Sequence, residues 1–369
     1  MKFKKEVTFK LGELFCGPGG IALGAFKTRI IKDDCLWQIK HAWANDYDFD
    51  TCQTYNYNLC PEQPETVICK DIRDLKIELL SQIDAFAYGF PCNDFSVIGE
   101  QKGFRGEFGP LYSYGVEVIN YFKPKFFFAE NVGGIRNIDE GTVLNKILSE
   151  LQNAGRGYRL TTHLYKFEEY GVPQTRHRVI IVGIEKTLDK VFCVPAPTHK
   201  NKPISAREAL ECPPIPKDAP NQEATAQSER VVRRLTYIKP GENCWNADLP
   251  QSLRLKVKGA KLSQIYRRLH PSRPSYTITG SGGGGTHGYH WEEPRALTNR
   301  ERARLQTFPD NYYFKGNKDS VRKQIGMAVS PLMSEIIFNS ILMTLAGIKY
   351  NSIDSCIGNQ IELFEEILV

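Results

Sequence analysis

The feature that most restricts the fold is an alternation of short β-rich runs with longer segments of helical periodicity through the first half of the chain. Such an alternation predicts βαβ units and a mostly parallel sheet. We expect strands at residues 8–15, 39–45, 66–70, 83–89, 125–129, 160–167 and 179–184. Sites in sheets of this kind lie beyond the carboxyl ends of the strands, so the residues at those ends are the first candidates for chemistry.

The sequence changes character near residue 185, where proline-rich, basic and glycine-rich stretches begin. Helical periodicity returns near Leu297, and the apolar segment 330–348 is expected to pack on the first domain. The chain of 369 residues exceeds the usual size of a single core, about 250–300 residues. We therefore predict a sheet domain over residues 1–188, a loop-rich domain over residues 189–293, and a hinge with helices that return to the sheet domain over residues 294–369.

Basic residues are concentrated in the expected loop-rich domain. Residues 230–273 hold eleven Lys and Arg side chains against two acidic ones, an excess of nine. Such an excess suits a surface that faces a polyanion. A solvated face without such a partner is the alternative.

Composition excludes several classes of protein. Hydrophobic residues make up 41% and charged residues 24%, as in folded globular proteins and unlike disordered ones. No apolar run approaches the roughly 20 residues that span a bilayer, and the first ten residues lack the apolar stretch of a signal peptide. The ten cysteines include no CxxC pair, so we expect reduced thiols and no metal site. The protein is therefore expected in the cytoplasm, without a membrane partner.

The motif FCGPGG at residues 15–20 separates the first expected strand from a helix that begins near Ile21. Its amides could face an anion or a carboxylate, although many such turns only close a βα unit. Asp46 at the next strand end could hold ribose hydroxyls, and Asp71 beyond the third could accept from an adenine amino group. Taken singly, each acid is more often a helix cap or a surface residue. In this order they predict a nucleoside-containing cofactor across the sheet.

The segment GFPCNDFS at residues 89–96 places Cys92 directly after Pro91 at a strand end. Such a stiff turn suits a nucleophile better than an inert core thiol, although a buried structural cysteine is the alternative. A free thiol is only about 3% ionised at pH 7, so a nucleophile needs an activating environment. Arg176 and Arg178 could supply it if the fold brings them near; otherwise they are exposed charges on a strand edge.

Glu130 and Asn131 follow the very apolar run FFFA. Partial desolvation there is expected to favour the protonated carboxyl group, which can donate to the ring nitrogen of a pyrimidine. A helix N-cap role for either residue is the alternative.

Together these segments resemble the cytosine-5 DNA methyltransferase family, in the family's own order. The segments are FCGPGG (15–20), GFPCNDFS (89–96), ENV (130–132), VPQTRHRVIIVG (172–183), RALTNRERARLQTFP (295–309) and QIGMAV (324–329). The resemblance covers the chain apart from about residues 190–290. It implies an α/β fold, with a Rossmann-like S-adenosylmethionine-dependent methyltransferase sheet domain plus a smaller, loop-rich target-recognition domain.

The resemblance also implies a role for individual residues. Cys92 would attack C6 of a cytosine turned out of duplex DNA, and Glu130 would bond its N3 and amino group. Arg176 would anchor the thiolate and the base, with Arg178 as a further catalytic residue. The cofactor S-adenosylmethionine would contact Phe15, Gly17, Gly19, Gly20, Asp46, Tyr47, Asp71, Ile72, Pro91, Leu111, Asn131, Ala328 and Val329. DNA would contact Asn93, Ser96, Arg233, Arg234, Arg267, Arg268, Thr279, Gly280, Ser281 and Gly282.

The implied biology is that of a restriction-modification system. The enzyme would be a monomer that associates with the nucleoid through duplex DNA and protects it from a cognate restriction endonuclease, without a stable complex with that enzyme. Two departures from the family pattern stand out. Asn93 replaces the usual Gln, and Met327 replaces a usual Asn, which could weaken cofactor binding or turnover.

Three other functions remain open at this point. A branch of the same family methylates cytosine in tRNA, but it has a much shorter region before the segment 295–309. A DNA-binding homologue with impaired catalysis would fit Met327. A dehydrogenase is the weakest alternative, because FCGPGG lacks the order G-x-G-x-x-G.

Overall fold

The computed structural model describes residues 4–90, 111–256, 262–283 and 285–357. The chain divides into two compact units. We call residues 1–166, 177–197 and 331–369 the sheet unit, and residues 167–176 and 198–330 the loop unit. The loop unit therefore also contains residues 167–176 and 294–330, which lie outside the range 189–293 expected for a loop-rich domain.

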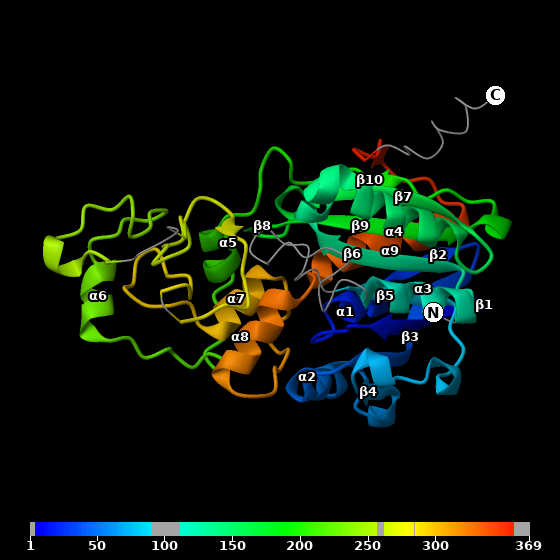
Figure 1. The fold of residues 1–369 in the computed structure, drawn as a ribbon, viewed down its shortest axis with the longest axis horizontal. Coiled ribbons are helices and arrows are strands. Elements are labelled where there is room, and N and C mark those ends of the chain that lie inside the picture. The colour runs from blue at the N-terminus through cyan, green and yellow to red at the C-terminus, as the bar shows by residue number, and fades with distance from the viewer. Residues whose placement is uncertain (1–3, 91–110, 257–261, 284, 358–369) are drawn as a thin grey trace. The chain divides into compact units, whose positions relative to one another are not determined.

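The sheet unit is built on an eight-stranded sheet (Figure 1). Its strands are β1 (Lys5–Leu14), β2 (Arg29–Lys32), β3 (Cys35–Asp46), β4 (Val67–Cys69), β5 (Ala85–Gly89), β6 (Phe126–Val132), β7 (Tyr158–Lys166) and β9 (His177–Glu185). They follow the order β2-β3-β1-β5-β6-β9-β7, and β4 pairs with β3. Strands β1, β3, β4, β5 and β6 pair in parallel, whereas β2, β7 and β9 run antiparallel to their neighbours. The predicted α/β class and mostly parallel sheet are confirmed.

Helices cover both faces of this sheet. They are α1 (Gly20–Lys27), α2 (Phe49–Leu59), α3 (Leu111–Phe122), α4 (Thr142–Asn153) and α9 (Pro331–Ala346). Strand β6 shows why both faces are apolar, because successive side chains of a strand point to opposite sides. Phe127 belongs to the core that α3 and α4 share, whereas the rings of Phe126 and Phe128 contact Phe338 of α9.

Helix α9 packs closely on α1 within the sheet unit. A side chain at Gly24 of α1 would collide with the backbone of Pro331 and Glu335, so the two helices approach at a point where only glycine fits. Short elements complete this unit: β10 (Val194–Pro195), β12 (Ser352–Ile353), η1 (Pro64–Thr66), η2 (Ile72–Asp74), η3 (Ile77–Leu79), η5 (Gly133–Gly141) and η7 (Lys186–Leu188).

The loop unit holds short helices joined by long irregular segments. Its elements are η6 (Phe167–Tyr170), β8 (Gln174–Thr175), α5 (Ala206–Glu211), α6 (Glu229–Leu235), η8 (Gln251–Leu253), β11 (Ser275–Tyr276), α7 (Asn299–Leu305) and α8 (Lys318–Met327). Strands β8 and β11 form a parallel ladder. A small core includes Leu235, Ile238, Leu249, Tyr266 and Tyr289.

One stretch, Lys318–Ala346, is long and apolar enough to cross a membrane, although the sequence led us to expect none. It consists of α8, α9 and the residues between them. Of its most apolar 18-residue window, 72% is buried inside the protein. Core helices of folded proteins meet the same criteria, so this is weak support for a membrane span.

Candidate active site

The glycine-rich turn lies between β1 and α1. Phe15, Gly17 and Gly19 adopt left-handed backbone conformations, with φ of 52°, 54° and 86°. Helix α1 begins at Gly20, and its N-cap residue Gly19 has no side chain with which to cap the first amides. A Cβ built at Gly17 would meet no described atom within 4 Å. Among the described residues, the turn therefore leaves open space beside Gly17.

Asp46, the last residue of β3, fixes this turn. Its Oδ2 accepts from the Gly17 amide (3.0 Å) and its Oδ1 from the Asp48 amide (3.0 Å). Burial raises the pKa of the Asp46 carboxyl group. The predicted ribose-binding acid is thus also the residue that holds the glycine turn. The Tyr47 side chain next to it is 62% exposed, which leaves its ring accessible for stacking.

Asp71 follows β4 and begins the short helix η2. Its carboxylate accepts from the Arg73 amide (2.9 Å) and forms an ion pair with the Arg73 guanidinium (2.6 Å). These hydrogen bonds from Arg73 lower the pKa of Asp71 to about 2. The structure thus places Asp71 in the helix-cap role that the sequence left open, while Ile72 beside it is buried.

Glu130 lies within β6, near its end, and its Oε1 forms an ion pair with Nε of Arg178 on the neighbouring strand β9 (2.9 Å). Both side chains are largely buried. The apolar run FFFA gave no indication of this guanidinium partner of Glu130. In β5, Gly89 lies opposite Glu130, and a side chain at that position would contact the Glu130 carboxylate. A glycine there leaves room beside the acid.

Asn131 links β6 to the end of β5. Its Nδ2 donates to the Phe90 carbonyl (3.3 Å), and its Oδ1 accepts from the Val132 amide (2.8 Å). Asn131 therefore holds the backbone at the point where β5 leads toward Pro91. The predicted site residues Pro91, Cys92, Asn93 and Ser96 lie outside the described residues. Leu111, the first residue of α3, packs half-buried against the core of the sheet unit.

Arg176 belongs to the loop unit, unlike Arg178. Its guanidinium is buried and donates to the carbonyl oxygens of Ile278 (3.2 Å), Gly326 (3.3 Å) and Ala328 (3.0 Å). These contacts hold the segment before β9 to the end of α8. The proposed contact of Arg176 with the Cys92 thiolate is not tested by them, because Cys92 lies outside the described residues.

Sequence reasoning missed two buried glutamines of this region. Gln174 donates to the side chain of Gln306 (2.8 Å) and accepts from the Ile278 amide (2.9 Å). Gln306 in turn donates to the Ile325 and Ala328 carbonyls. Gln174 lies in the segment VPQTRHR and Gln306 in the segment ERARLQTFP, both of which carry the family resemblance. Their place in these two motifs was the sequence feature that could have indicated them.

The segment QIGMAV ends helix α8. Ala328 and Val329 are buried, whereas the Met327 side chain is 58% exposed. The residue that departs from the family pattern therefore faces outward, between neighbours that the fold holds in place.

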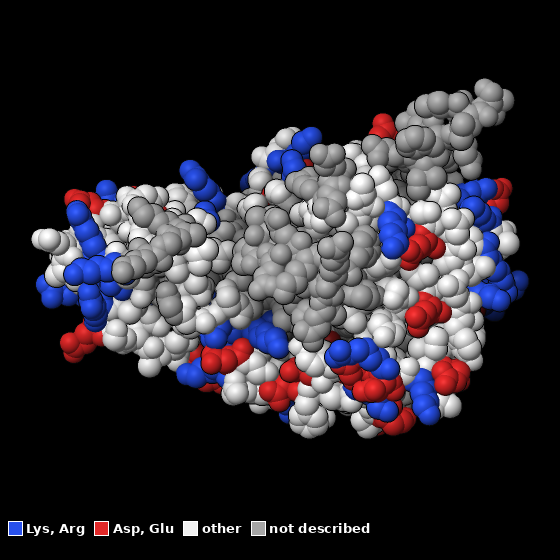
Figure 2. All heavy atoms as spheres, in the orientation of Figure 1, with Lys and Arg blue, Asp and Glu red and all other residues white. Residues whose placement is uncertain are grey.

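The four candidate DNA-binding arginines differ in their surroundings. On the face shown in Figure 2, Lys and Arg side chains gather over helix α6, where Arg233 is exposed. Arg234 and Arg268 are buried instead. Arg234 donates to the Leu253 carbonyl (2.8 Å) and stacks on the Tyr266 ring. This corrects our expectation for Arg234 and Arg268, because side chains enclosed in the loop unit are not available to DNA.

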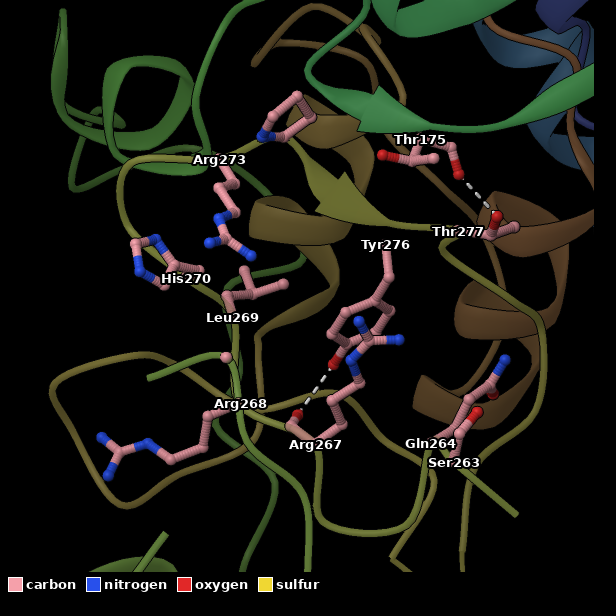
Figure 3. Close-up of a pocket in the computed structure, with 12 residues that line it drawn as sticks. Thr175, Ser263, Gln264, Arg267, Arg268, Leu269, His270, Arg273, Tyr276 and Thr277 are labelled. Carbon is pink, nitrogen blue, oxygen red and sulfur yellow. Dashed lines mark hydrogen bonds between the residues drawn. The ribbon is translucent and has the colours of Figure 1, made fainter. Parts of the chain in front are cut away.

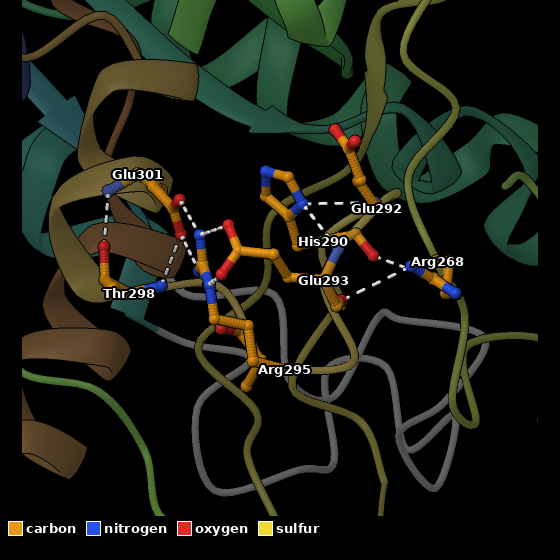
Figure 4. A network of polar contacts seen from close by, with 8 residues as sticks. Arg268, His290, Glu292, Glu293, Arg295, Thr298 and Glu301 are labelled. Atoms are coloured by element: carbon orange, nitrogen blue, oxygen red, sulfur yellow. Dashed lines mark hydrogen bonds and ion pairs between the residues drawn. The ribbon is translucent and has the colours of Figure 1, made fainter. Parts of the chain in front are cut away.

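Arg268 is the clearest case (Figure 4). Its guanidinium donates to the carbonyl oxygens of Leu235 (3.0 Å), Ile238 (2.9 Å) and His290 (2.8 Å), and at 3.4 Å to that of Glu293. The same network continues through Arg295, which forms ion pairs with Glu293 and Glu301 (Figure 4). Glu301 completes a capping box with Thr298 at the start of α7.

The glycine-rich segment after β11 is partly fixed by close packing on α8. A side chain at Gly326 would collide with the backbone of Thr279 and Gly280. Gly282 lies against the Arg322 guanidinium, and the hydroxyl groups of Thr279 and Ser281 are 2.7 Å apart. The segment therefore begins as an anchored loop.

No metal centre accompanies these features in the part of the chain that the structure describes. Within it, no group of three or more His, Cys, Asp or Glu side chains could hold a metal ion. The nine cysteines of the same residues are free thiols.

Comparison with known proteins defines the class. The family model for C-5 cytosine-specific DNA methylases matches residues 9–343. The chain is 56% identical over 362 residues to the type II methyltransferase M.BbvI of Brevibacillus brevis, with 96% of this chain and 95% of that protein covered. It is 38% identical to M.NgoFVII of Neisseria gonorrhoeae, with 94% and 89% covered.

A solved structure shows the same fold. It is an Escherichia coli prophage-encoded protein described as a DNA modification methyltransferase, with a TM-score of 0.68, 23% identity, and 91% of this chain and 99% of that chain covered. The protein belongs to the C-5 cytosine-specific DNA methylase family. The resemblance noted in the sequence and the assignment to this enzyme class are confirmed.

Proposed function

We propose that this protein methylates C5 of cytosine in duplex DNA with S-adenosylmethionine as donor, and that Cys92 is its nucleophile. The observation that carries the proposal is the family match over residues 9–343, together with the 56% identity to a type II methyltransferase. The pairing of Glu130 with Arg178 beside the strand that leads to Cys92 supports the catalytic assignment.

The first part of the sheet unit fits the cofactor. Gly17 faces open space, the Tyr47 ring is exposed, and α1 begins without a side-chain cap. Asp46 keeps the turn in shape and would accept from ribose hydroxyls. When bound, S-adenosylmethionine supplies an electrophilic methyl group. The further proposed contacts are Phe15, Gly19, Gly20, Asp71, Ile72, Pro91, Leu111, Asn131, Ala328 and Val329.

The chain's own residues would activate the cytosine. A base inside a duplex is inaccessible, so the target leaves the stack before reaction. The Cys92 thiolate forms a bond to C6, and the electron density gained at C5 accepts the methyl group. Glu130 binds N3 and the amino group, and Arg178 positions Glu130 through its ion pair. Loss of the C5 proton and departure of the Cys92 thiolate then restore the ring.

We assign the target-recognition role to the loop unit. The exposed Arg233 and the anchored segment of Thr279, Gly280, Ser281 and Gly282 are candidate DNA contacts, with Asn93 and Ser96 of the sheet unit. Modification of host DNA would protect it from a cognate restriction endonuclease, in keeping with the type II methyltransferases that this chain resembles. We propose a monomer that acts in the cytoplasm.

The test is methyl transfer from tritium-labelled cofactor to duplex DNA and to tRNA. We expect label on DNA, and none from Cys92→Ala, which should still bind DNA in a gel-shift assay. Turnover by Cys92→Ala, or label on tRNA alone, would refute the proposal. Duplexes that contain 5-fluorocytosine distinguish a pure DNA binder, because only a nucleophilic enzyme forms a stable covalent adduct with them.

A further inference from the structure

The loop unit contains a pocket that the catalytic assignment does not use (Figure 3). Its volume is about 480 Å³, and it lies between the segment 263–277, Thr175 and Gly241. Its lining residues include three arginines, Arg267, Arg268 and Arg273, together with Thr175 and Tyr276. No acidic residue is among them.

Among the described residues, two guanidinium groups of this pocket have neither an ion-pair partner nor a hydrogen-bond acceptor. In the described part of the chain, the side chains of Arg267 and Arg273 form no ion pair and donate no hydrogen bond, in contrast to Arg268. Figure 3 shows the Arg268 side chain pointing away from Tyr276. A pocket with two unpaired cations and no carboxylate is suited to an anionic or acceptor-rich ligand.

Arg267 is held in a fixed orientation. Its guanidinium carbon lies 4.6 Å from the centre of the Tyr276 ring, and the Tyr276 hydroxyl donates to the Arg267 carbonyl (2.8 Å). The ring itself is fixed, because Tyr276 pairs with Thr175 in the ladder of β11 and β8. Gly288 also lies against the Tyr276 ring, because a Cβ at Gly288 would come within 2.8 Å of the Tyr276 hydroxyl oxygen. Stacking on a fixed ring sets the plane in which Arg267 presents its donors.

Such an arrangement favours base recognition over a simple charge contact. A phosphate can be held by any flexible cation, including Lys, whereas a planar fork of donors matches the O6 and N7 acceptors of guanine in the major groove. Arg273 is exposed and has no stacking partner in the described residues, so it is suited to the phosphate backbone.

We propose that this pocket reads a guanine of the target duplex, with Arg267 donating to its O6 and N7 and Arg273 binding a nearby phosphate. The inference rests on the proposed function, because it assumes that duplex DNA is the substrate. It adds the identity of a specificity-determining residue and the kind of base that it selects.

The test first maps the methylated sequence by bisulfite sequencing of DNA treated with the wild-type enzyme. Each guanine of that sequence is then replaced singly by 7-deazaguanine, which lacks the N7 acceptor. We expect the wild-type rate to fall about ten- to hundredfold at one guanine. Arg267→Ala should be insensitive to that replacement and should accept other bases there. Arg267→Lys, whose ammonium group can still donate to N7 but lacks the planar fork, should accept other bases more readily than the wild type. An unchanged site profile in both variants would overturn the proposal.

Arg273→Ala provides the matched control. It should weaken binding equally for all sequences and reduce the slope of log K against log salt by about 0.9 for one lost phosphate contact. If Arg267→Ala behaved in this way instead, Arg267 would be a phosphate contact and the guanine assignment would be wrong. If the wild-type enzyme methylates no DNA, the proposed function is wrong. If the wild-type enzyme methylates DNA but the Arg267 variants keep its sequence specificity, only the guanine assignment is wrong.

Discussion

The buried polar groups of the two units differ in chemistry. In the sheet unit, the Tyr55 hydroxyl donates to Glu13 (3.2 Å) and contacts His41 (3.4 Å), which bonds Thr66 (2.7 Å). Burial raises the pKa of Glu13 well above its usual range and lowers that of His41 to about 4. In the loop unit, buried arginines such as Arg268 donate to backbone carbonyls instead.

The difference follows from what each unit must satisfy. A sheet pairs its own backbone, so buried polar side chains such as Tyr55, Glu13 and His41 are free to bond one another. A unit of long irregular segments leaves carbonyl oxygens unpaired, and guanidinium groups with five donors can satisfy several of them at once. We therefore expect the stability of the loop unit to depend on individual arginines, and that of the sheet unit to depend on the protonation of the buried His41.

The largest effect is expected for Arg268→Met. The substitution removes the guanidinium group, which donates to the carbonyl oxygens of Leu235, Ile238 and His290. These three oxygens then lose that donor. We expect the free energy of unfolding to fall by about 3–5 kcal/mol, measured by urea denaturation. An unchanged midpoint of urea denaturation would show that water replaces the guanidinium group as donor. The loop unit would then not depend on this buried arginine, and the difference between the two units would disappear.

Gly326→Ala should have the next largest effect. The added methyl group would collide with the backbone of Gly280, which cannot move aside without disturbing the loop. We expect a loss of about 2–3 kcal/mol in urea denaturation. Gly282→Ala is the matched control, because the three atoms nearest to its methyl group belong to the end of the Arg322 side chain and not to the backbone. Equal losses in both variants would argue against a rigid contact at Gly326.

His41 should make the sheet unit sensitive to acid. Burial lowers its folded pKa to about 4, whereas the unfolded side chain titrates near 6.5. The unfolded state therefore binds more protons in this window, and stability falls as the pH drops from about 6.5 toward 4. We expect a loss of about 1–2 kcal/mol, reduced by partial exposure. Glu13 titrates in both proteins, so the difference between wild type and His41→Gln isolates His41; parallel curves would contradict its role.

The smallest effect on stability is expected for Arg267→Ala. The Arg267 guanidinium donates no hydrogen bond within the described residues, so the substitution removes only its stacking on the Tyr276 ring. We expect a decrease of about 0.5–1 kcal/mol in the free energy of unfolding. A loss comparable to that of Arg268→Met would mean that Arg267 is part of the framework and not a residue kept for a ligand.

Local patterns were sufficient for the main secondary structure. Each of the seven expected strands overlaps an observed strand of the sheet. Strand β2 was missed, although a signal was present. Asp33 and Asp34 have φ of 51° and 58° and form the two-residue turn between β2 and β3. Aspartate adopts a positive φ more often than most residues, but the pair lacks the glycine of the usual two-residue hairpin turns, so the signal was weak.

The roles of single charged residues were not predictable in the same way. Arg267 and Arg268 are adjacent and contribute equally to the basic excess. The Arg267 guanidinium stacks on the Tyr276 ring, however, whereas the Arg268 guanidinium donates to buried backbone carbonyls. Arg176 and Arg178 likewise belong to different units. Hydrogen-bond acceptors that are distant in sequence decide these roles, and only the folded chain brings them together.

The discontinuity of the loop unit has a practical consequence for engineering. Strand β8 precedes the main stretch 198–330 by more than twenty positions, yet it pairs with β11, and its Gln174 amide reaches the side chain of Gln306. A chimaera that received residues 198–330 alone would lack β8. It would therefore lose the pairing of β8 with β11 and the hydrogen bond between Gln174 and Gln306. Exchange of this unit between relatives therefore needs two inserts spliced together.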